Sequence, residues 1–412
     1  MYPSTLSILS VMSLLASATP VHASRKAHAS TLGPRAPLPA AAAQHAPPAP
    51  HRHRRRSLSS SDRPLVTKRR RSSTSPLVKK RKRSSPPSPA ANPKYQRHII
   101  PNSKKRSSSS SSTSTSPSYS LSQSSMGGYS FFDDWDFFTA PDPTHGQVNF
   151  NSASESWDNG LVYVPNPGQN STVMRVDSWT TLPYGALRNS VRISSKQTVS
   201  IGSLVIADIA QIPWGPTVWP AFWMVGDNWP MGGEIDIIEG VHDSVQNQYT
   251  LHTAPGCTLT TPMQAAGAVL ATDCDAYANY NTGCGVQDTS RESYGSGWNA
   301  AGGGIYAMLW DETGISMYNF VRDQIPSDIT SGSPDPSSWG TPRARWDATS
   351  CNMTQFFGDQ TIVFDITLGG DWAGSTYQSA GFSGTWQSAI EDPTNFVNAV
   401  WEVNSVKVYT QN

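Results

Sequence analysis

The sequence predicts an all-β domain, an antiparallel sandwich or jelly roll, that follows a long, disordered basic segment. Short runs of alternating apolar and polar residues, with glycine and proline turns between them, carry this prediction. Thr172–Val176, Ile315–Phe320 and Val403–Val408 have the period of two that places alternate side chains on opposite faces of a strand. Helical periodicity is limited to a short piece near Pro393–Asn398.

The charge of the chain is divided between two regions. The 412 residues have a formal net charge of +1, but residues 1–125 hold 22 basic residues and a single acid, Asp62. The remainder holds 9 basic residues, 29 acidic residues and all 14 tryptophans. This distribution excludes one uniform globular protein, because the two regions have opposite charge.

The first 23 residues are predicted to be a secretory signal peptide. An apolar run from Leu6 to Ala18 is followed by Val21-His22-Ala23, which gives the usual spacing of a cleavage site, although the start lacks Lys and Arg. The run is shorter than the roughly 20 apolar residues that span a bilayer, and no later stretch is apolar enough for a transmembrane helix. We therefore expect a secreted, extracellular protein that is soluble or associated with the cell wall.

Residues 24–127 are predicted to be disordered, because a segment rich in Ser, Pro, Arg and Lys cannot bury enough apolar surface to offset its conformational entropy. Three roles are open: a plain linker, a pro-segment cut at dibasic sites such as Lys82-Arg83 and Lys105-Arg106, and a polycation that binds anionic wall polymers. Nucleic acid is not an expected partner, because secretion would separate the protein from nucleic acids and the segment lacks aromatic residues for base stacking.

The predicted β domain, residues 128–412, contains an even number of cysteines. They are Cys257, Cys274, Cys284 and Cys351. In a secreted chain this predicts two disulfides, and four cysteines allow three pairings. The sequons at Asn170 and Asn352 predict N-glycosylation of an exposed surface.

One segment, Trp229–Gly240, concentrates three carboxylates among large β-branched residues. In a strand, Glu234 and Asp236 point to one face, and Ile235 and Ile237 point to the other face. Glu239 has the wrong parity for the carboxylate face. One extra residue, a β-bulge near Ile237-Ile238, would return it to that face.

Three carboxylates on one face repel one another, which raises the pKa of at least one of them. That is the condition of a retaining glycosidase, in which one carboxylate is the nucleophile and a second keeps its proton as general acid. Retention requires carboxyl groups about 5–5.5 Å apart, which two glutamates on a concave face can reach. A calcium site and a solvated acidic face are the alternatives. Calcium favours loops and backbone carbonyls, so neither a metal nor a cofactor is predicted.

Aromatic residues near the carboxylates are predicted to bind substrate, because aromatic rings stack on flat apolar surfaces such as sugar-ring faces. Trp219, Trp223 and Trp229 lie just upstream, and His252 lies on the next predicted strand. Trp372 lies in a glycine-flanked loop suited to the lip of a cleft. Core packing is the alternative role for each of these residues.

The motif Gly233–Gly240, with acids at relative positions one, three and six, resembles the bulged signature of glycoside hydrolase family 16. Further motifs extend the resemblance from Phe131 to about Asn412. They are Asp142–Gly146, Arg188–Arg192, Trp219–Trp223, Thr250–Thr253, Asn299–Gly304 and Gly370–Gly374. Together they resemble the fungal endo-1,3(4)-β-glucanase, or laminarinase-like, branch. This implies a curved jelly roll with a substrate cleft on its concave face.

The resemblance also implies roles for individual residues. Glu234 would be the nucleophile, Glu239 the general acid/base and Asp236 the carboxylate that assists them. The implied cleft residues are Trp219, Trp223, Trp229, His252 and Trp372.

The cysteine pattern departs from that of the relatives, which often have cysteines near Pro216, Gly369, Phe382 and Trp386. The four cysteines that remain are consistent with Cys257–Cys274 and Cys284–Cys351. Loss of the other cross-links predicts a looser loop around Trp372 and an altered cleft.

These features predict a secreted, monomeric endo-β-glucanase that hydrolyses β-1,3 or mixed β-1,3/1,4-glucan with retention. A cell-wall glucan transglycosylase that uses the same carboxylates is the main alternative. A non-catalytic glucan-binding module is disfavoured, because binding alone does not require three clustered carboxylates.

Overall fold

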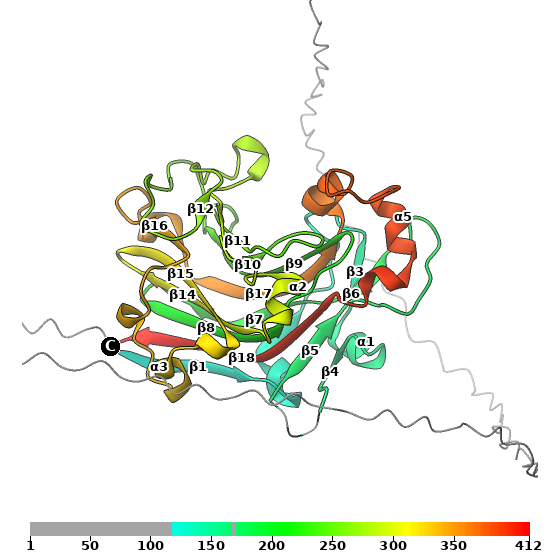
Figure 1. Cartoon of the computed structure of the whole chain (residues 1–412), viewed down its shortest axis with the longest axis horizontal. Helices are drawn as coiled ribbons and strands as arrows, with labels where there is room; N and C mark the ends of the chain where they lie inside the picture. The colour runs from blue at the N-terminus through cyan, green and yellow to red at the C-terminus, as the bar shows by residue number, and fades with distance from the viewer. Residues whose placement is uncertain (1–117, 167, 169) are drawn as a thin grey trace, which may run out of the picture. The chain divides into compact units, whose positions relative to one another are not determined.

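The computed structural model describes residues 118–412 except 167 and 169. Within this range the chain forms two curved eight-stranded antiparallel sheets that pack against each other (Figure 1). The predicted antiparallel sandwich is confirmed. None of the helices in the described range is long and apolar enough to cross a membrane. The predicted signal peptide and all the basic clusters of the N-terminal segment lie outside the described residues.

The two sheets, here called sheet A and sheet B, take their strands from distant parts of the sequence. In spatial order, sheet A consists of β16 (Ala344–Asp347), β15 (Gly314–Val321), β14 (Gly304–Asp311), β8 (Ser203–Gln211), β18 (Val400–Gln411), β5 (Thr172–Arg175) and β4 (Val162–Tyr163), and β1 (Tyr119–Met126) pairs with β18. Sheet B consists of β12 (Ala268–Val269), β13 (Val286–Gln287), β11 (Gln248–His252), β10 (Glu234–Glu239), β9 (Val218–Gly226), β17 (Gln360–Leu368), β7 (Arg192–Val199) and β2 (Trp135–Phe137).

The remaining elements are short and connect or flank the sheets. A parallel pair is formed by β3 (Val148–Phe150) and β6 (Arg188–Ser190). The α-helices are α1 (Ala153–Asp158), α2 (Gly295–Ala300), α3 (Ser327–Ser331), α4 (Met353–Phe356) and α5 (Trp386–Glu391). The 3₁₀ turns are Tyr129–Asp134, Asn279–Asn281, Arg322–Gln324, Pro336–Ser338 and Pro393–Phe396, and Gly370–Gly374 forms a π-helical turn.

The main core lies between the sheets and is rich in aromatic side chains. Phe222 of β9 stacks on Phe364 of β17, with ring centroids 4.5 Å apart. Trp401 of β18 meets Phe364 edge-on at 5.3 Å, which joins sheet A to sheet B. Because alternate residues of sheet B point into this core, the others are left on its concave face.

Strand β1 differs from the sequence prediction, which placed residues 24–127 in a disordered segment. Its main chain pairs with β18 from Tyr119 opposite Gln411 to Met126 opposite Ser405. Half of its side chains are small serines, and only Tyr119 packs against a buried apolar cluster. The strand therefore depends on backbone hydrogen bonds more than on apolar burial, and composition gave no sign of it.

The disulfide pairing implied by the resemblance, Cys257–Cys274 and Cys284–Cys351, is wrong. The structure pairs Cys257 with Cys351 and Cys274 with Cys284. The main chains of Cys257 and Cys274 are indeed neighbours, since the Cys274 N–H donates to the Cys257 carbonyl at 3.2 Å. Their side chains nevertheless bond to other partners, and chain adjacency alone does not fix that choice.

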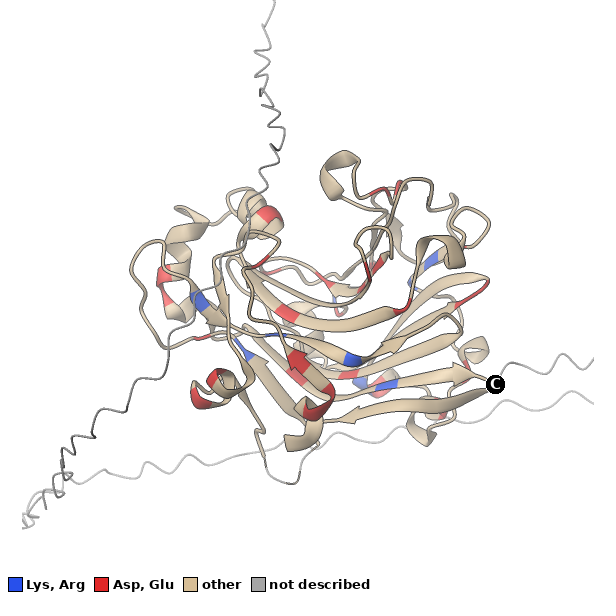
Figure 2. Cartoon of the chain, turned by 180° about the vertical axis from the view of Figure 1, so that it is seen from behind, with Lys and Arg blue, Asp and Glu red and all other residues tan. Residues whose placement is uncertain are grey.

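The described domain is acidic, as the distribution of charge along the sequence predicts. From Met126 onward the chain has 29 acidic and 9 basic residues. Figure 2 shows the acidic residues spread over strands and loops, with few basic residues among them. Both sequon residues, Asn170 and Asn352, are exposed, and their glycosylation stays a prediction.

Candidate active site

A β-bulge in β10 brings the three predicted carboxylates to one face. Across β11, Asp236 lies opposite Thr250 and Glu239 lies opposite Gln248, so two residues of β10 stand against one of β11. The register against β9 also shifts between Asp236 and Ile238. The bulge predicted from side-chain parity is therefore confirmed. All three carboxylates line one cleft, while Ile235, Ile237 and Ile238 are buried.

The cleft has a volume of about 460 Å³ and lies on the outer face of sheet B. Alternate residues of β9 line it, because Trp219 and Trp223 point away from the core that holds Phe222. Trp229 precedes β10 and is 45% exposed. The full lining is Asp142, Pro143, Thr144, Arg192, Trp219, Ala221, Trp223, Val225, Trp229, Glu234, Asp236, Glu239, Asn281, Asp365, Thr367 and Asp371.

Tryptophan indoles donate hydrogen bonds to the glutamates. Trp219 Nε1 donates to Glu239 Oε1 at 2.9 Å, and Trp229 Nε1 donates to Glu234 Oε2. These indoles are thus fixed in orientation while their ring faces line the cleft.

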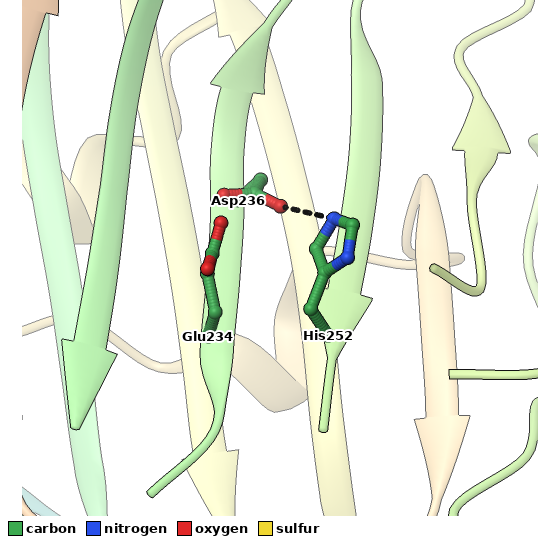
Figure 3. Close-up of side chains that lie close together, drawn as sticks. All are labelled: Glu234, Asp236 and His252. Carbon is green, nitrogen blue, oxygen red and sulfur yellow. Dashed lines mark ion pairs between the residues drawn. The ribbon is translucent and has the colours of Figure 1, made fainter. Parts of the chain in front are cut away.

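Asp236 lies between Glu234 and His252, as Figure 3 shows. His252 Nε2 is 3.5 Å from Asp236 Oδ2, and its Nδ1 is 2.8 Å from Asn281 Oδ1. Asn281 belongs to the loop between Cys274 and Cys284, so that disulfide closes the segment that orients His252.

Burial of the carboxyl groups raises the pKa of Glu234 and that of Glu239 to about 7 each. The indole hydrogen bonds oppose this effect in both residues. Burial also raises the pKa of Asp236 well above its usual range, and the charges of Glu234 and Glu239 add to that effect. Burial lowers the pKa of His252. The two pKa shifts have opposite signs, and each favours the neutral form of its group.

The neighbours of the two glutamates differ. The hydrogen bond between Asp236 and Glu234 raises the pKa of Asp236 and lowers that of Glu234. Asp236 and the Trp229 indole thus both oppose the effect of burial on the pKa of Glu234. For Glu239, the Trp219 indole and the charge of His252 lower the pKa, whereas the charges of Glu234 and Asp365 add to the effect of burial.

Glu234, Asp236 and His252 are also the described residues that could hold a metal ion, since one polar atom of each lies within 4.8 Å of the others. In this cluster the buried Asp236 Oδ2 lies 3.5 Å from His252 Nε2 and has no hydrogen-bond partner among the described residues.

Trp372 lies in the π-helical turn and is not itself among the residues that line the cleft, although its neighbour Asp371 is. Its ring meets Trp219 edge-on, with centroids 5.7 Å apart. The turn is held to the Asp142–Gly146 loop by an Asp371 N–H bond to the Thr144 carbonyl at 3.0 Å and by the His145–Asp371 ion pair at 2.9 Å. These contacts fix the loop that the sequence predicts to be looser than in relatives, and that prediction remains untested.

Further cleft residues were not assigned a role from the sequence. Asp365 of β17 accepts a hydrogen bond from Trp223 Nε1 at 3.0 Å, and burial raises its pKa to about 7. The Arg192 guanidinium lies 5.1 Å from the Trp223 ring centroid. Arg192 ends one motif of the resemblance, but Asp365 lies in a run of apolar residues that reads as a buried strand. Only the pairing of β17 with β9 shows that it faces the cleft.

Comparisons with a family model and with known proteins all point to the same family. A family model described as "XgeA-like, catalytic GH16 domain" matches residues 135–409. A Schizosaccharomyces pombe protein named "Probable glycosidase" is 42% identical over 287 residues, which cover 68% of this chain and 67% of that protein. The endo-1,3(4)-β-glucanase of Arthroderma benhamiae is 38% identical, over 68% of this chain and 63% of its own. The chain spans 46% of the length of an Aspergillus fumigatus relative described as a probable endo-1,3(4)-β-glucanase.

Two solved structures are similar over the same region. Laminarinase 16A of Phanerochaete chrysosporium, solved with two β-glucans in its donor and acceptor sites, is 36% identical with a TM-score of 0.68. An elongating family 16 β-1,3-glucosyltransferase is 40% identical with a TM-score of 0.66. Each match covers 71% of this chain and 100% of the solved chain.

Proposed function

Because the chain belongs to glycoside hydrolase family 16, whose members act on O-glycosyl bonds, we propose that it is a retaining endo-β-glucanase that cleaves β-1,3 or mixed β-1,3/1,4-glucan. The observation that carries this proposal is a pair of glutamates on one bulged strand, both lining the same tryptophan-lined cleft and each accepting a hydrogen bond from a tryptophan indole. Laminarinase 16A was solved with β-glucan oligosaccharides, and laminarin is therefore the first substrate to test.

The first step uses the two glutamates in different protonation states. Glu239 gives its proton to the glycosidic oxygen while the Glu234 carboxylate attacks the anomeric carbon, so the glycosidic bond breaks as the glycosyl-enzyme bond forms. Asp236 and Trp229 hold Glu234 ionised and oriented for this attack. The leaving glucan segment departs with the proton from Glu239.

The second step reverses the role of Glu239. Glu239 is now a carboxylate and takes a proton from water as the water oxygen attacks the anomeric carbon. The bond to Glu234 breaks and the sugar leaves with the configuration of the substrate. The proton taken from water restores the acid form of Glu239, which completes the cycle.

Replacement of the nucleophile tests the proposal. Glu234→Gln keeps the size of the side chain and its contact with Trp229 but removes the attacking carboxylate, so laminarin hydrolysis should fall by a factor on the order of 10⁴ or more. Reducing ends released from laminarin and lichenan provide the measurement. Glu312→Gln, the same change at an exposed turn, should have wild-type activity. A Glu234→Gln variant that keeps most of its activity contradicts the assignment.

Transglycosylation is a second candidate, and the similarity to the elongating β-1,3-glucosyltransferase favours it. Both reactions use the same glycosyl-enzyme, and they differ in whether water or a glucan hydroxyl attacks it. Mass spectrometry of products from laminari-oligosaccharides separates them. Products longer than the substrate indicate transfer, whereas only shorter products indicate hydrolysis.

Secretion, N-glycosylation at Asn170 and Asn352, a monomeric state and wall binding through the basic segment are parts of the same proposal. The supporting observations are the apolar start of the chain, the exposure of both asparagines and the clustered charge of residues 24–127. Sequencing the N-terminus of the secreted protein shows whether the basic segment is kept. Isoelectric focusing gives an independent answer, because the domain without that segment is strongly acidic.

A further inference from the structure

The bulge in β10 leaves backbone groups without a regular ladder partner at the position where Glu239 turns into the cleft. Between the paired positions Asp236–Thr250 and Glu239–Gln248, β10 has two residues and β11 has one. A buried backbone N–H or C=O without a partner costs free energy, so the bulge needs other hydrogen bonds to persist.

The side chain of Asn247, just before β11, supplies them. Its Oδ1 accepts the Glu239 N–H at 3.0 Å, and its Nδ2 donates to the Ile237 carbonyl at 2.9 Å. The carboxamide thus bonds to both ends of the Ile237–Glu239 stretch, with its acceptor toward an N–H and its donor toward a C=O. If the amide were flipped, its NH₂ group would face the Glu239 N–H and its oxygen would face the Ile237 carbonyl.

Asn247 is itself held rigidly. It is completely buried, and its own N–H donates to Ser293 Oγ at 3.0 Å. Its carbonyl accepts the Asp288 N–H at 2.8 Å. Every polar group of the residue therefore has a partner, and no freedom remains for the side chain to leave the bulge.

The same loop also supports the residue that follows Glu239. The Tyr294 ring packs so closely on Gly240 that a Cβ on this glycine would lie 2.8 Å from it. The loop from Asp288 to Tyr294 thus supports the end of β10 at two points, directly through Tyr294 and through Asn247.

We propose that Asn247 is a positioning residue for the general acid/base: its carboxamide fixes the bulge that directs Glu239 into the cleft. This proposal rests on the function proposed above. Asn247 itself does not line the cleft, so it acts through the backbone of Glu239 and not on the substrate. Glu234 lies on the other side of the bulge, and its place depends much less on Asn247.

The test compares two substrates that differ in their need for an acid. Departure of a glucan segment from laminarin requires protonation, whereas dinitrophenolate leaves a dinitrophenyl β-laminaribioside without it. Asn247→Ala should lower kcat/KM on laminarin about 10²-fold, within the range that general acid catalysis contributes. On the dinitrophenyl substrate the loss should stay below about tenfold. Azide, which attacks the glycosyl-enzyme without a general base, should raise turnover of this variant.

Asn299→Ala is the matched control. The Asn299 side chain makes the same pair of bonds to one loop residue elsewhere, accepting the Ile212 N–H at 2.8 Å and donating to the Ile212 carbonyl at 3.0 Å. Its loss should lower stability without changing the ratio between the two substrates. An equal loss on both substrates for Asn247→Ala, as a purely structural role requires, overturns the proposal.

Asn247→Asp covers the case in which the alanine variant does not fold. This variant keeps the volume and the acceptor for the Glu239 N–H, but it loses the donor and adds a charge near Glu239. The basic limb of the pH–activity profile should therefore move to higher pH, since a nearby negative charge raises the pKa of the general acid. An unmoved limb together with equal losses on both substrates overturns the proposal. If the proposed function itself is wrong, the wild-type enzyme cleaves neither substrate, which is a distinct outcome.

Discussion

The outward faces of the two sheets are built by the same alternation of side chains but have opposite chemistry. On sheet B this face holds four carboxyl groups whose pKa is raised by burial, those of Glu234, Asp236, Glu239 and Asp365. On sheet A it holds a second apolar cluster. That cluster contains Leu204, Ile206, Ile305, Ala307, Tyr318, Ile329, Trp339 and Tyr409.

The difference shows how the molecule separates stability from chemistry. The segment of α3 and the following 3₁₀ turn covers sheet A, where Trp339 meets Tyr318 edge-on at 5.2 Å. The corresponding face of sheet B stays open as the cleft. Its acids cost stability where they are buried, and that cost is tolerable because apolar packing elsewhere offsets it.

The largest effect is expected on the open face. Glu239→Ala removes the proposed acid/base and should lower laminarin hydrolysis by about 10²–10⁴-fold with little change in thermal stability. Azide should restore turnover by forming a β-glycosyl azide, which mass spectrometry detects. A variant that azide does not rescue, or that has lost stability along with activity, would contradict the division of catalysis and stability between the two faces.

The covered face should respond in the opposite manner. Trp339→Ala removes an indole ring that is only 9% exposed, together with the hydrogen bond from Trp339 Nε1 to Asp328 Oδ2. The free energy of unfolding should therefore fall by about 3 kcal/mol. Below the unfolding transition, kcat/KM on laminarin should be unchanged. Denaturant unfolding and initial rates measure the two quantities. A large drop in kcat/KM would show that the faces are coupled.

The acids of the cleft also predict how stability depends on pH. Glu234, Glu239 and Asp365 have pKa values near 7 when folded, against ordinary values of 4.5 or 3.8. Between these limits the folded state binds more protons than the unfolded state, so stability should fall as pH rises from about 4.5 through 7. Asp365→Asn should flatten this dependence. Melting temperatures that rise across the window would contradict it.

The smallest effect is expected beside the cleft. Trp372→Ala removes a ring that packs on Trp219 and is not among the residues that line the cleft. KM for laminarin should rise by up to about tenfold while kcat changes little, because ring stacking contributes on the order of 1 kcal/mol. A fall in kcat with constant KM would instead place Trp372 in the chemistry.

The sequence predicted those parts of the site that follow from parity. The period of two placed Glu234 and Asp236 on one face, and the odd spacing of Glu239 required the bulge that the structure contains. The aromatic content identified the cleft tryptophans, and the alternating runs identified the sandwich.

The parts that failed depend on contacts between distant segments. The cysteine partners follow from side-chain direction in a long loop, and pattern alone does not reveal it. Strand β1 has a serine-rich sequence and is specified by pairing with β18. Asp365 and Asn247 look like ordinary polar residues until the folded sheet places one opposite Trp223 and the other beside the bulge.

The central claim is that Glu234 forms a covalent bond with the sugar while Glu239 handles the proton. A laminari-oligosaccharyl fluoride with fluorine at the 2-position reacts in the first step but slows the second, so the glycosyl-enzyme accumulates. Proteolysis and mass spectrometry of the labelled protein then locate the sugar. The mechanism predicts a single label on Glu234, and a label on Asp236, Glu239 or Asp365, or products of inverted configuration with no label, would contradict it.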